Sequence, residues 1–241
     1  MADQEQGHGN KEEHVSAGEY VKSAVFGGFD GLCTCLIVVI AGVGNASTPT
    51  LILAIGISSM LGDGLGMGAA DYLGTKSDDE YMTQEENRER QEIENDFEAE
   101  KEEMIHIYTE MGLEKAVSNE IVDILSKNKE GFLKIMMIEE LQLLAGGENP
   151  FTNSVVTFIS FVLFGFTPLI PTLIAHAQGL VHMNNAIIIQ TIIISVFFLA
   201  VLGLCKSCVG GLPWYLSIPE TLLVGALASG AAYGMGKALA G

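Results

Sequence analysis

The amino-acid sequence predicts an all-α membrane protein with five transmembrane helices and a cytosolic helical domain inserted between helices 2 and 3. Of the 241 residues, 49% are hydrophobic, yet the formal net charge is −18. This combination is expected only where apolar and charged residues are segregated along the chain. Residues 77–149 hold 21 of the 30 acidic side chains and 7 of the 12 basic ones, and the long apolar runs lie outside that range. The composition argues against a nucleic-acid binder, which needs clustered basic residues, and against a disulfide-stabilised secreted domain.

Five apolar segments predict the membrane helices, because about 20 apolar residues cross the hydrocarbon core. They are residues 24–43, 50–73, 151–175, 186–204 and 221–236. Pro168 and Pro171 predict a kink near the end of the third segment. The fifth segment is short and spans the membrane only if flanking residues extend it. Small residues spaced four apart in the second and fifth segments predict close helix packing there.

The chain therefore divides into a polar N-terminal segment (1–19), helices 1 and 2 (20–76), the acidic insert (77–149) and helices 3 to 5 (150–241). Residues 1–19 do not resemble a cleavable signal peptide, so the first helix is expected to act as the insertion signal. Lysines outside the spans favour a cytosolic location for the N-terminus and for residues 77–149. Those that support this orientation are Lys11, Lys22, Lys76 and Lys206, whereas Lys237 opposes it.

Acidic residues inside the first two spans are the first functional candidates. A carboxylate near the centre of a membrane helix costs roughly 2.5–3.5 kcal/mol, and no Lys or Arg occurs in either span to pair with Asp30 or Asp63. Each is therefore either protonated or hydrogen-bonded, or faces a water-filled path that carries cations, and we favour the path for Asp30.

Methionine alternates with aspartate on one face of the second span. At 100° per residue, its members fall within an arc of about 80°; they are Met60, Asp63, Met67 and Asp71. Carboxylate oxygen beside soft thioether sulfur suits a borderline divalent transition metal. Glu19 lies eleven residues before Asp30, nearly on the same helical face, where it could gather cations at the mouth of the path.

The insert begins with residues 77–108, which lack Gly and Pro and predict one continuous helix that Ser77 or Asp78 could cap. Acidic residues share one face of that helix within about 80°: Glu85, Glu89, Glu92, Asp96, Glu100 and Glu103. Like charges spaced three and four apart destabilise a helix. Arg88 and Arg90 lie off that face and should relieve little of this repulsion, so we favour bound metal ions as the source of compensating charge. The alternative is an acidic surface that is simply exposed to solvent.

A second helical segment, residues 121–144, has a candidate break at Gly131 and places Met136 one turn before Glu140. Carboxylates on one helix diverge, so two or three helices would have to meet to complete a coordination shell. A di-iron carboxylate site uses two Glu-x-x-His pairs. The insert has only one, Glu103-x-x-His106, which argues against an oxidase. Nucleotide-binding and nucleophile motifs are absent, and the four cysteines are interpreted as reduced and structural.

Several motifs together resemble the vacuolar iron transporter (VIT) family. They are Phe29-Asp30-Gly31-Leu32 in the first span, the run 66–77 at the end of the second, the acidic stripe, and residues 133–137 followed by Glu140. The resemblance runs from about residue 20 to the C-terminus. It implies a homodimeric secondary transporter, not an enzyme, that moves Fe²⁺ from the cytosol into a vacuole-like organelle in exchange for protons. We further expect binding of other divalent metals such as Zn²⁺, Mn²⁺ and Co²⁺, contact with membrane lipid, and neither a prosthetic group nor a nucleic-acid partner.

The resemblance also implies roles for individual residues. Asp30 and Met67 correspond to translocation ligands, and the metal ligands of the insert correspond to Glu89, Glu92, Glu100, Glu103, Met136, Met137 and Glu140. The chain departs from the family pattern at Ser23 and Ser59, where an acid is common, and Asp63 lies one turn from Ser59. The alternative from another functional class is a membrane-anchored metal buffer or partner-docking protein that moves no ions.

Overall fold

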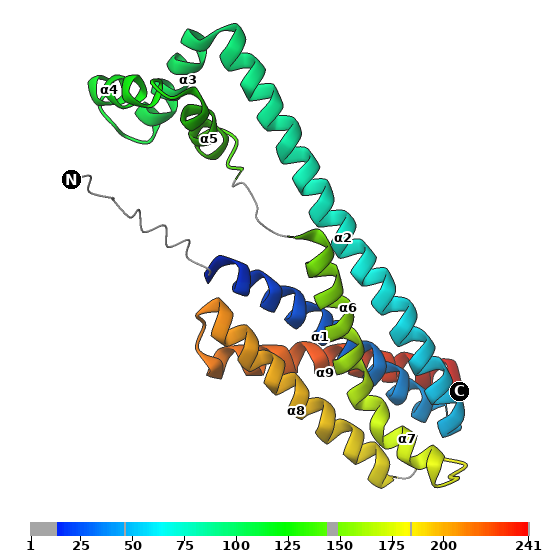
Figure 1. The fold of residues 1–241 in the computed structure, drawn as a ribbon. Coiled ribbons are helices and arrows are strands. Elements are labelled where there is room, and N and C mark those ends of the chain that lie inside the picture. Colours follow the sequence, from blue (N-terminus) through cyan, green and yellow to red (C-terminus); the bar gives the residue numbers. More distant parts are fainter. Residues whose placement is uncertain (1–13, 46, 144–148, 184, 241) are drawn as a thin grey trace, which may run out of the picture. The chain divides into compact units, whose positions relative to one another are not determined.

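The computed structural model describes residues 14–240 apart from 46, 144–148 and 184. Within these residues every regular element is a helix (Figure 1). The elements are α1 (His14–Gly44), α2 (Pro49–Asn95), α3 (Phe97–Glu110), α4 (Lys115–Leu125), α5 (Lys129–Glu139), α6 (Pro150–Phe166), the 3₁₀ turn η1 (Thr167–Leu169), α7 (Ile170–Ala177), α8 (Asn185–Gly210) and α9 (Trp214–Ala240). The described residues form two compact units: those within 14–73 and 149–240, here the membrane unit, and those within 74–143, here the acidic unit.

Five helical segments in the described part are long and apolar enough to cross a membrane, as the hydropathy predicted. They are Tyr20–Gly44, Pro49–Asn95, Pro150–Ala177, Asn185–Cys208 and Trp214–Met235. The predicted kink in the third is the 3₁₀ turn η1, which contains Pro168 and separates α6 from α7. The fifth gains the flanking residues it needed, because α9 begins at Trp214 and tolerates Pro219 in its first two turns.

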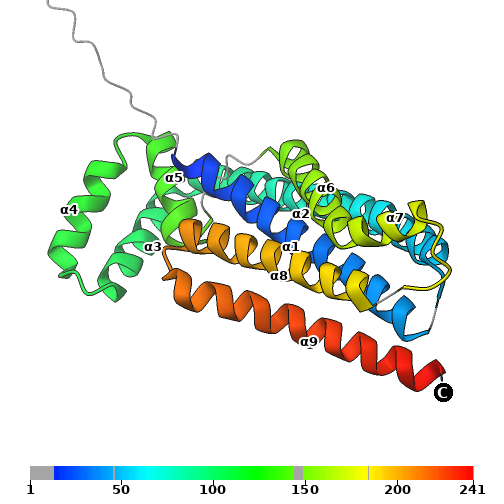
Figure 2. The ribbon, with the colours of Figure 1, turned by 90° about the horizontal axis from the view of Figure 1, so that it is seen from below.

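In the membrane unit, α1 packs against α6, α8 and α9, and Figure 2 shows α8 and α9 side by side. The contact between α1 and α6 is so close that a Cβ atom at Gly27 or Gly31 would collide with backbone oxygens of Thr157 and Phe161, respectively. Small residues permit such close approach of helices in lipid. Glycine is therefore required at these two positions of α1.

The sequence predicted the close packing for other glycines, and the structure bears this out only in part. In α2, Gly56, Gly64 and Gly68 pack against side chains of the third span, and in α9 Gly225 contacts Leu199. At four other glycines for which the sequence predicted close packing, a Cβ atom would have no neighbour within 4 Å in this single chain: Gly62, Gly66, Gly230 and Gly234. Packing within one chain does not explain these four.

The prediction of one continuous acidic helix over residues 77–108 was wrong. α2 starts before this stretch and ends at Asn95, and Asp96 leaves the helical conformation with φ −146° and ψ 72°. The Asp96 side chain then caps α3 by accepting a hydrogen bond from the backbone N–H of Ala99 at 3.2 Å. Asp and Asn are good helix caps because their side chains satisfy free N–H groups at a helix start. The stripe is thus divided between α2 and α3.

The second helical segment also breaks elsewhere than expected. The chain leaves α4 after Leu125 and starts α5 at Lys129, with Asn128 as the cap that accepts from the Gly131 N–H at 3.1 Å. Gly131 therefore lies within α5. The core of the acidic unit consists of Ile93, Met104, Val122, Phe132, Leu133, Met136 and Met137.

Candidate metal centre and membrane carboxylates

Three carboxylates from separate elements converge in the acidic unit. Glu89 comes from α2, Glu100 from α3 and Glu140 from the residue that ends α5. One carboxylate oxygen of each lies within 4.8 Å of those of the other two. This spacing suits a divalent cation that accepts one oxygen from each side chain.

The turn at Asp96 produces this convergence. Glu89 and Glu100 are eleven residues apart, so one straight helix would separate them by about 16.5 Å along its axis. Because α2 ends at Asn95 and α3 starts at Phe97, the chain can reverse and bring the two carboxylates together. The hydrophobic core then positions α5, since Phe132 and Met136 are fully buried between these helices.

The three carboxylates are largely withdrawn from water. Glu89 is only 1% exposed, and its Oε2 atom, like Oε2 of Glu140, has no hydrogen-bond partner among the described residues. Burial, followed by the negative charges of Glu89 and Glu103, raises the pKa of Glu100 to about 7 and that of Glu140 to about 7. Buried carboxylate oxygens without partners are costly. A bound cation would neutralise this cluster and supply the missing partners.

The other proposed ligands of the insert lie around these three. Glu92 and Glu103 are exposed, and both interact electrostatically with Glu100 and Glu140. Glu103 and Glu140 also line a pocket of about 580 Å³ together with His106. Met136 and Met137 are buried in the core, 0% and 9% exposed. The His106 side chain is largely exposed and lies 3.8 Å from Glu110.

Arg88 was expected to relieve little of the repulsion in the acidic stripe because it lies off that face, and this expectation was wrong. Its guanidinium lies 2.9 Å from Glu85, 3.2 Å from Glu89 and 3.9 Å from Glu92. Arginine is long and has five N–H donors, so helical projection from its Cα underestimates what it reaches. Arg90 behaves as predicted, since it pairs with Glu86 and Glu130 and not with the three converging carboxylates.

In the membrane unit, Asp30 of α1 and Asp63 of α2 are both exposed on the single chain. Their carboxylates are close enough to interact electrostatically. Two acids on neighbouring spans thus share one side of the unit, which the sequence alone did not establish.

The remaining predicted pathway residues differ from these two. Asp71 is half-buried and accepts a hydrogen bond from Thr157 Oγ1 at 2.7 Å, so part of its hydrogen-bonding capacity is satisfied by α6. Met67 is half-buried and packs against the apolar cluster that contains Met60 and Phe161. Glu19 lies on α1, but its side chain is outside the described residues.

Comparison with known proteins agrees with the motifs. Residues 21–237 match the model of the VIT family. The chain is 33% identical to a vacuolar iron transporter of Toxoplasma gondii, with 95% of this chain and 78% of the relative covered. It is also 33% identical to the vacuolar iron transporter of Centaurea cyanus (96% and 92% covered) and to vacuolar iron transporter 1 of Arabidopsis thaliana (94% and 88% covered). With five apolar helices and a match over nearly its whole length, the chain belongs to the VIT family, whose members are transporters rather than enzymes.

Proposed function

We propose that this protein moves Fe²⁺ from the cytosol into a vacuole-like organelle in exchange for protons. Relatives named as vacuolar iron transporters over almost the full chain support iron as the cargo and the vacuole as the destination. The acidic unit captures the ion on the cytosolic side, and the first two spans carry it across. Zn²⁺, Mn²⁺ and Co²⁺ are further candidate cargoes, because carboxylate and thioether ligands do not select strongly among these ions.

The observation that carries this proposal is the convergence of Glu89, Glu100 and Glu140. Carboxylates brought this close repel one another unless protons or a cation compensate them. Here two of the three also have a buried oxygen without a partner among the described residues. Glu92, Glu103, Met136 and Met137 complete the proposed ligand set, with Glu92 and Glu103 at the exposed rim.

The transport path uses Asp30 and Asp63, assisted by Glu19, Met67 and Asp71. Exposed carboxylates on a membrane-spanning helix are costly in lipid and are normally covered by protein or water. We therefore place this side of the membrane unit in the interface of a homodimer. The open Gly62 and Gly66 flank Asp63 and would let a second copy approach closely.

Proton exchange follows from the chemistry of the same groups. A carboxylate binds either a proton or a metal ion, so binding of Fe²⁺ at Asp30 releases a proton and departure of the ion allows reprotonation. An acidic lumen then favours release of the metal on that side. Asp63 takes the place of the acid that the family often has at Ser59.

The test is a flux assay with the full chain in sealed vesicles, under an imposed pH gradient. Fe²⁺, Mn²⁺, Co²⁺ and Zn²⁺ are offered separately, with Ca²⁺ as the control for a hard cation. Fe²⁺ should enter with opposite movement of protons, and collapse of the gradient should slow it. Metal binding without flux would instead identify a membrane-anchored metal buffer.

A further inference from the structure

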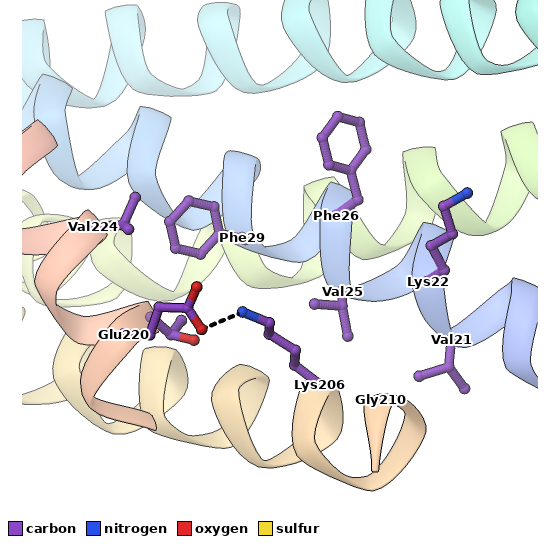
Figure 3. A pocket seen from close by; sticks show the side chains of 10 residues that line it. Val21, Lys22, Val25, Phe26, Phe29, Lys206, Gly210, Glu220 and Val224 are labelled. Atoms are coloured by element: carbon purple, nitrogen blue, oxygen red, sulfur yellow. Dashed lines mark hydrogen bonds and ion pairs between the residues drawn. The ribbon is translucent and has the colours of Figure 1, made fainter. Parts of the chain in front are cut away.

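A pocket of about 440 Å³ lies between α1, α8 and α9 of the membrane unit (Figure 3), and neither Asp30 nor Asp63 is among its lining residues. Its lining residues recur every fourth position on α1 and on α9, so each helix contributes a row along its length. The residues used below are Val21, Val25 and Phe29 of α1, Lys206 of α8, and Glu220 and Val224 of α9. The rows on α1 extend over two helical turns, roughly 12 Å. This elongated apolar groove has the shape of a site for a hydrocarbon chain.

The polar part of the lining carries a net positive charge. Lys206 Nζ forms an ion pair with Glu220 Oε2 at 2.6 Å, which is the dashed line in Figure 3. Lys22 of α1 also lines the pocket and is exposed. Because Lys206 and Glu220 neutralise each other, Lys22 leaves the lining with one positive charge. A monoanionic group would balance it.

Aromatic residues indicate the depth of the groove in the bilayer. Trp214 and Tyr215 begin α9, are 62% and 59% exposed, and pack edge to face with their ring centroids 6.0 Å apart. Exposed Trp and Tyr are typical of the membrane–water interface. Glu220 lies six residues further along α9, about 9 Å deeper. Long lysine side chains at this depth reach the level of the lipid headgroups.

We propose that this groove binds one anionic glycerophospholipid, with an acyl chain along Val21, Val25 and Phe29 and its phosphate beside Lys22, whose side chain points away from the Lys206–Glu220 pair in Figure 3. One phosphodiester charge matches the net charge of the lining, whereas a zwitterionic headgroup does not. A second copy of the chain fits less well, because an isologous contact through this face would set its positive charge against itself. The proposal does not depend on iron transport.

The experiment compares phosphatidylglycerol with phosphatidylcholine of the same acyl chains, bound to the full chain in detergent and observed by native mass spectrometry. The wild-type protein should retain phosphatidylglycerol preferentially. Lys22→Gln and Lys206→Gln should each reduce this preference about fivefold, the effect expected for one lysine near a membrane surface. Lys237→Gln is the matched control, because Lys237 lies in the last turn of α9, far along the helix from Glu220. This variant should not change the preference for phosphatidylglycerol.

Two further variants distinguish lipid binding from a structural role of the Lys206–Glu220 ion pair. Glu220→Gln removes a negative charge from the lining and should strengthen the preference for phosphatidylglycerol. If the ion pair had only a structural role, this variant would not increase the preference. Val25→Trp fills the groove and should lower retention of both lipids.

Equal retention of the two lipids by the wild-type protein, or displacement of phosphatidylglycerol by inorganic phosphate alone, would overturn the proposal. So would conversion of dimers to monomers by Val25→Trp, since that would assign the groove to a subunit contact.

Discussion

The membrane unit and the acidic unit use carboxylates in opposite ways. In the membrane unit the acids are few and lie on separate turns of α1 and α2, and Asp30 and Asp63 are exposed on the single chain. In the acidic unit Glu89, Glu100 and Glu140 come from three elements and meet within 4.8 Å. The first arrangement suits an ion that passes from one group to another. The second suits an ion that is held.

The two units also differ in what keeps their helices together. α1 and α6 approach so closely that glycine is needed at Gly27 and Gly31. The acidic unit instead has a core of larger side chains such as Met104, Phe132 and Met136, all fully buried. Lipid provides no hydrophobic driving force between helices, so close packing replaces it in the membrane unit, whereas water drives the burial in the other. A change that affects one unit should therefore leave the other largely intact.

Replacement of Asp30 should have the strongest consequence, which is the loss of transport. Asp30→Asn keeps the shape of the side chain but removes the charge that binds the ion, so Fe²⁺ flux into vesicles should cease. Metal binding by the acidic unit should be unchanged, and measurement of both on one preparation separates the units. Wild-type flux in this variant would contradict the proposed path.

The reverse separation is expected for the acidic cluster. Replacement of Glu89, Glu100 and Glu140 together by Gln should lower Co²⁺ affinity at least about a hundredfold, because the ligand charges are lost. Flux should fall without stopping, since the path through the spans remains. Glu94→Gln, an exposed acid of α2 outside the cluster, is the control. Equal affinity of the triple variant and this control would place the metal site elsewhere.

The difference in packing can be tested at Gly31. Gly31→Ala places a methyl group against the backbone of Phe161 and should destabilise the membrane unit by about 1–3 kcal/mol, as overpacking does. Thermal unfolding followed by the fluorescence of Trp214, the single tryptophan of the chain, reports on this unit alone. Gly230→Ala adds the same group where no atom lies within 4 Å. Equal melting temperatures for the two variants would show that the contact between α1 and α6 can relax.

Metal binding by the acidic unit should depend on pH near neutrality. The pKa values of Glu100 and Glu140 are raised to about 7, so both groups hold protons below that pH and the metal has to displace them. Affinity should therefore rise with pH, by about tenfold or more between pH 6 and pH 8, and then level off. Titration of the full chain with Co²⁺ at several pH values measures this. An affinity that is constant over this interval would mean that the ion does not bind these carboxylates.

The smallest effect is expected at Arg88, which competes with a metal ion for Glu89. Arg88→Gln should raise Co²⁺ affinity by about two- to fivefold, since exposed ion pairs are weak. Arg90→Gln is the matched control on the same helix, because Arg90 pairs with Glu86 and Glu130 instead. An affinity gain in both variants would indicate a general charge effect rather than competition at Glu89.

The acidic cluster could be predicted from the sequence only in part. The stripe identified Glu89 and Glu100 because helical projection places acids spaced three, four and eight apart on one face. This projection assumed one continuous helix, whereas α2 ends at Asn95. The dipeptide Asn95-Asp96, two residue types that favour helix ends, was the available signal for the break. Arg88 was missed for a related reason, since a projection follows the Cα atom and not the reach of the side chain.

The amino-acid sequence alone was enough to predict the helical class, the five membrane segments and the concentration of acids in residues 77–149. These properties depend on local composition, because the hydrocarbon core admits only segments that are apolar over about 20 residues. The three-dimensional arrangement was needed to show that Glu89, Glu100 and Glu140 meet and that Asp30 and Asp63 share a side. It was also needed to show that Gly31 rather than Gly62 lies against a neighbouring backbone. Such contacts join residues far apart in the chain, and they depend on the angles of turns and on helix packing, which no local pattern specifies.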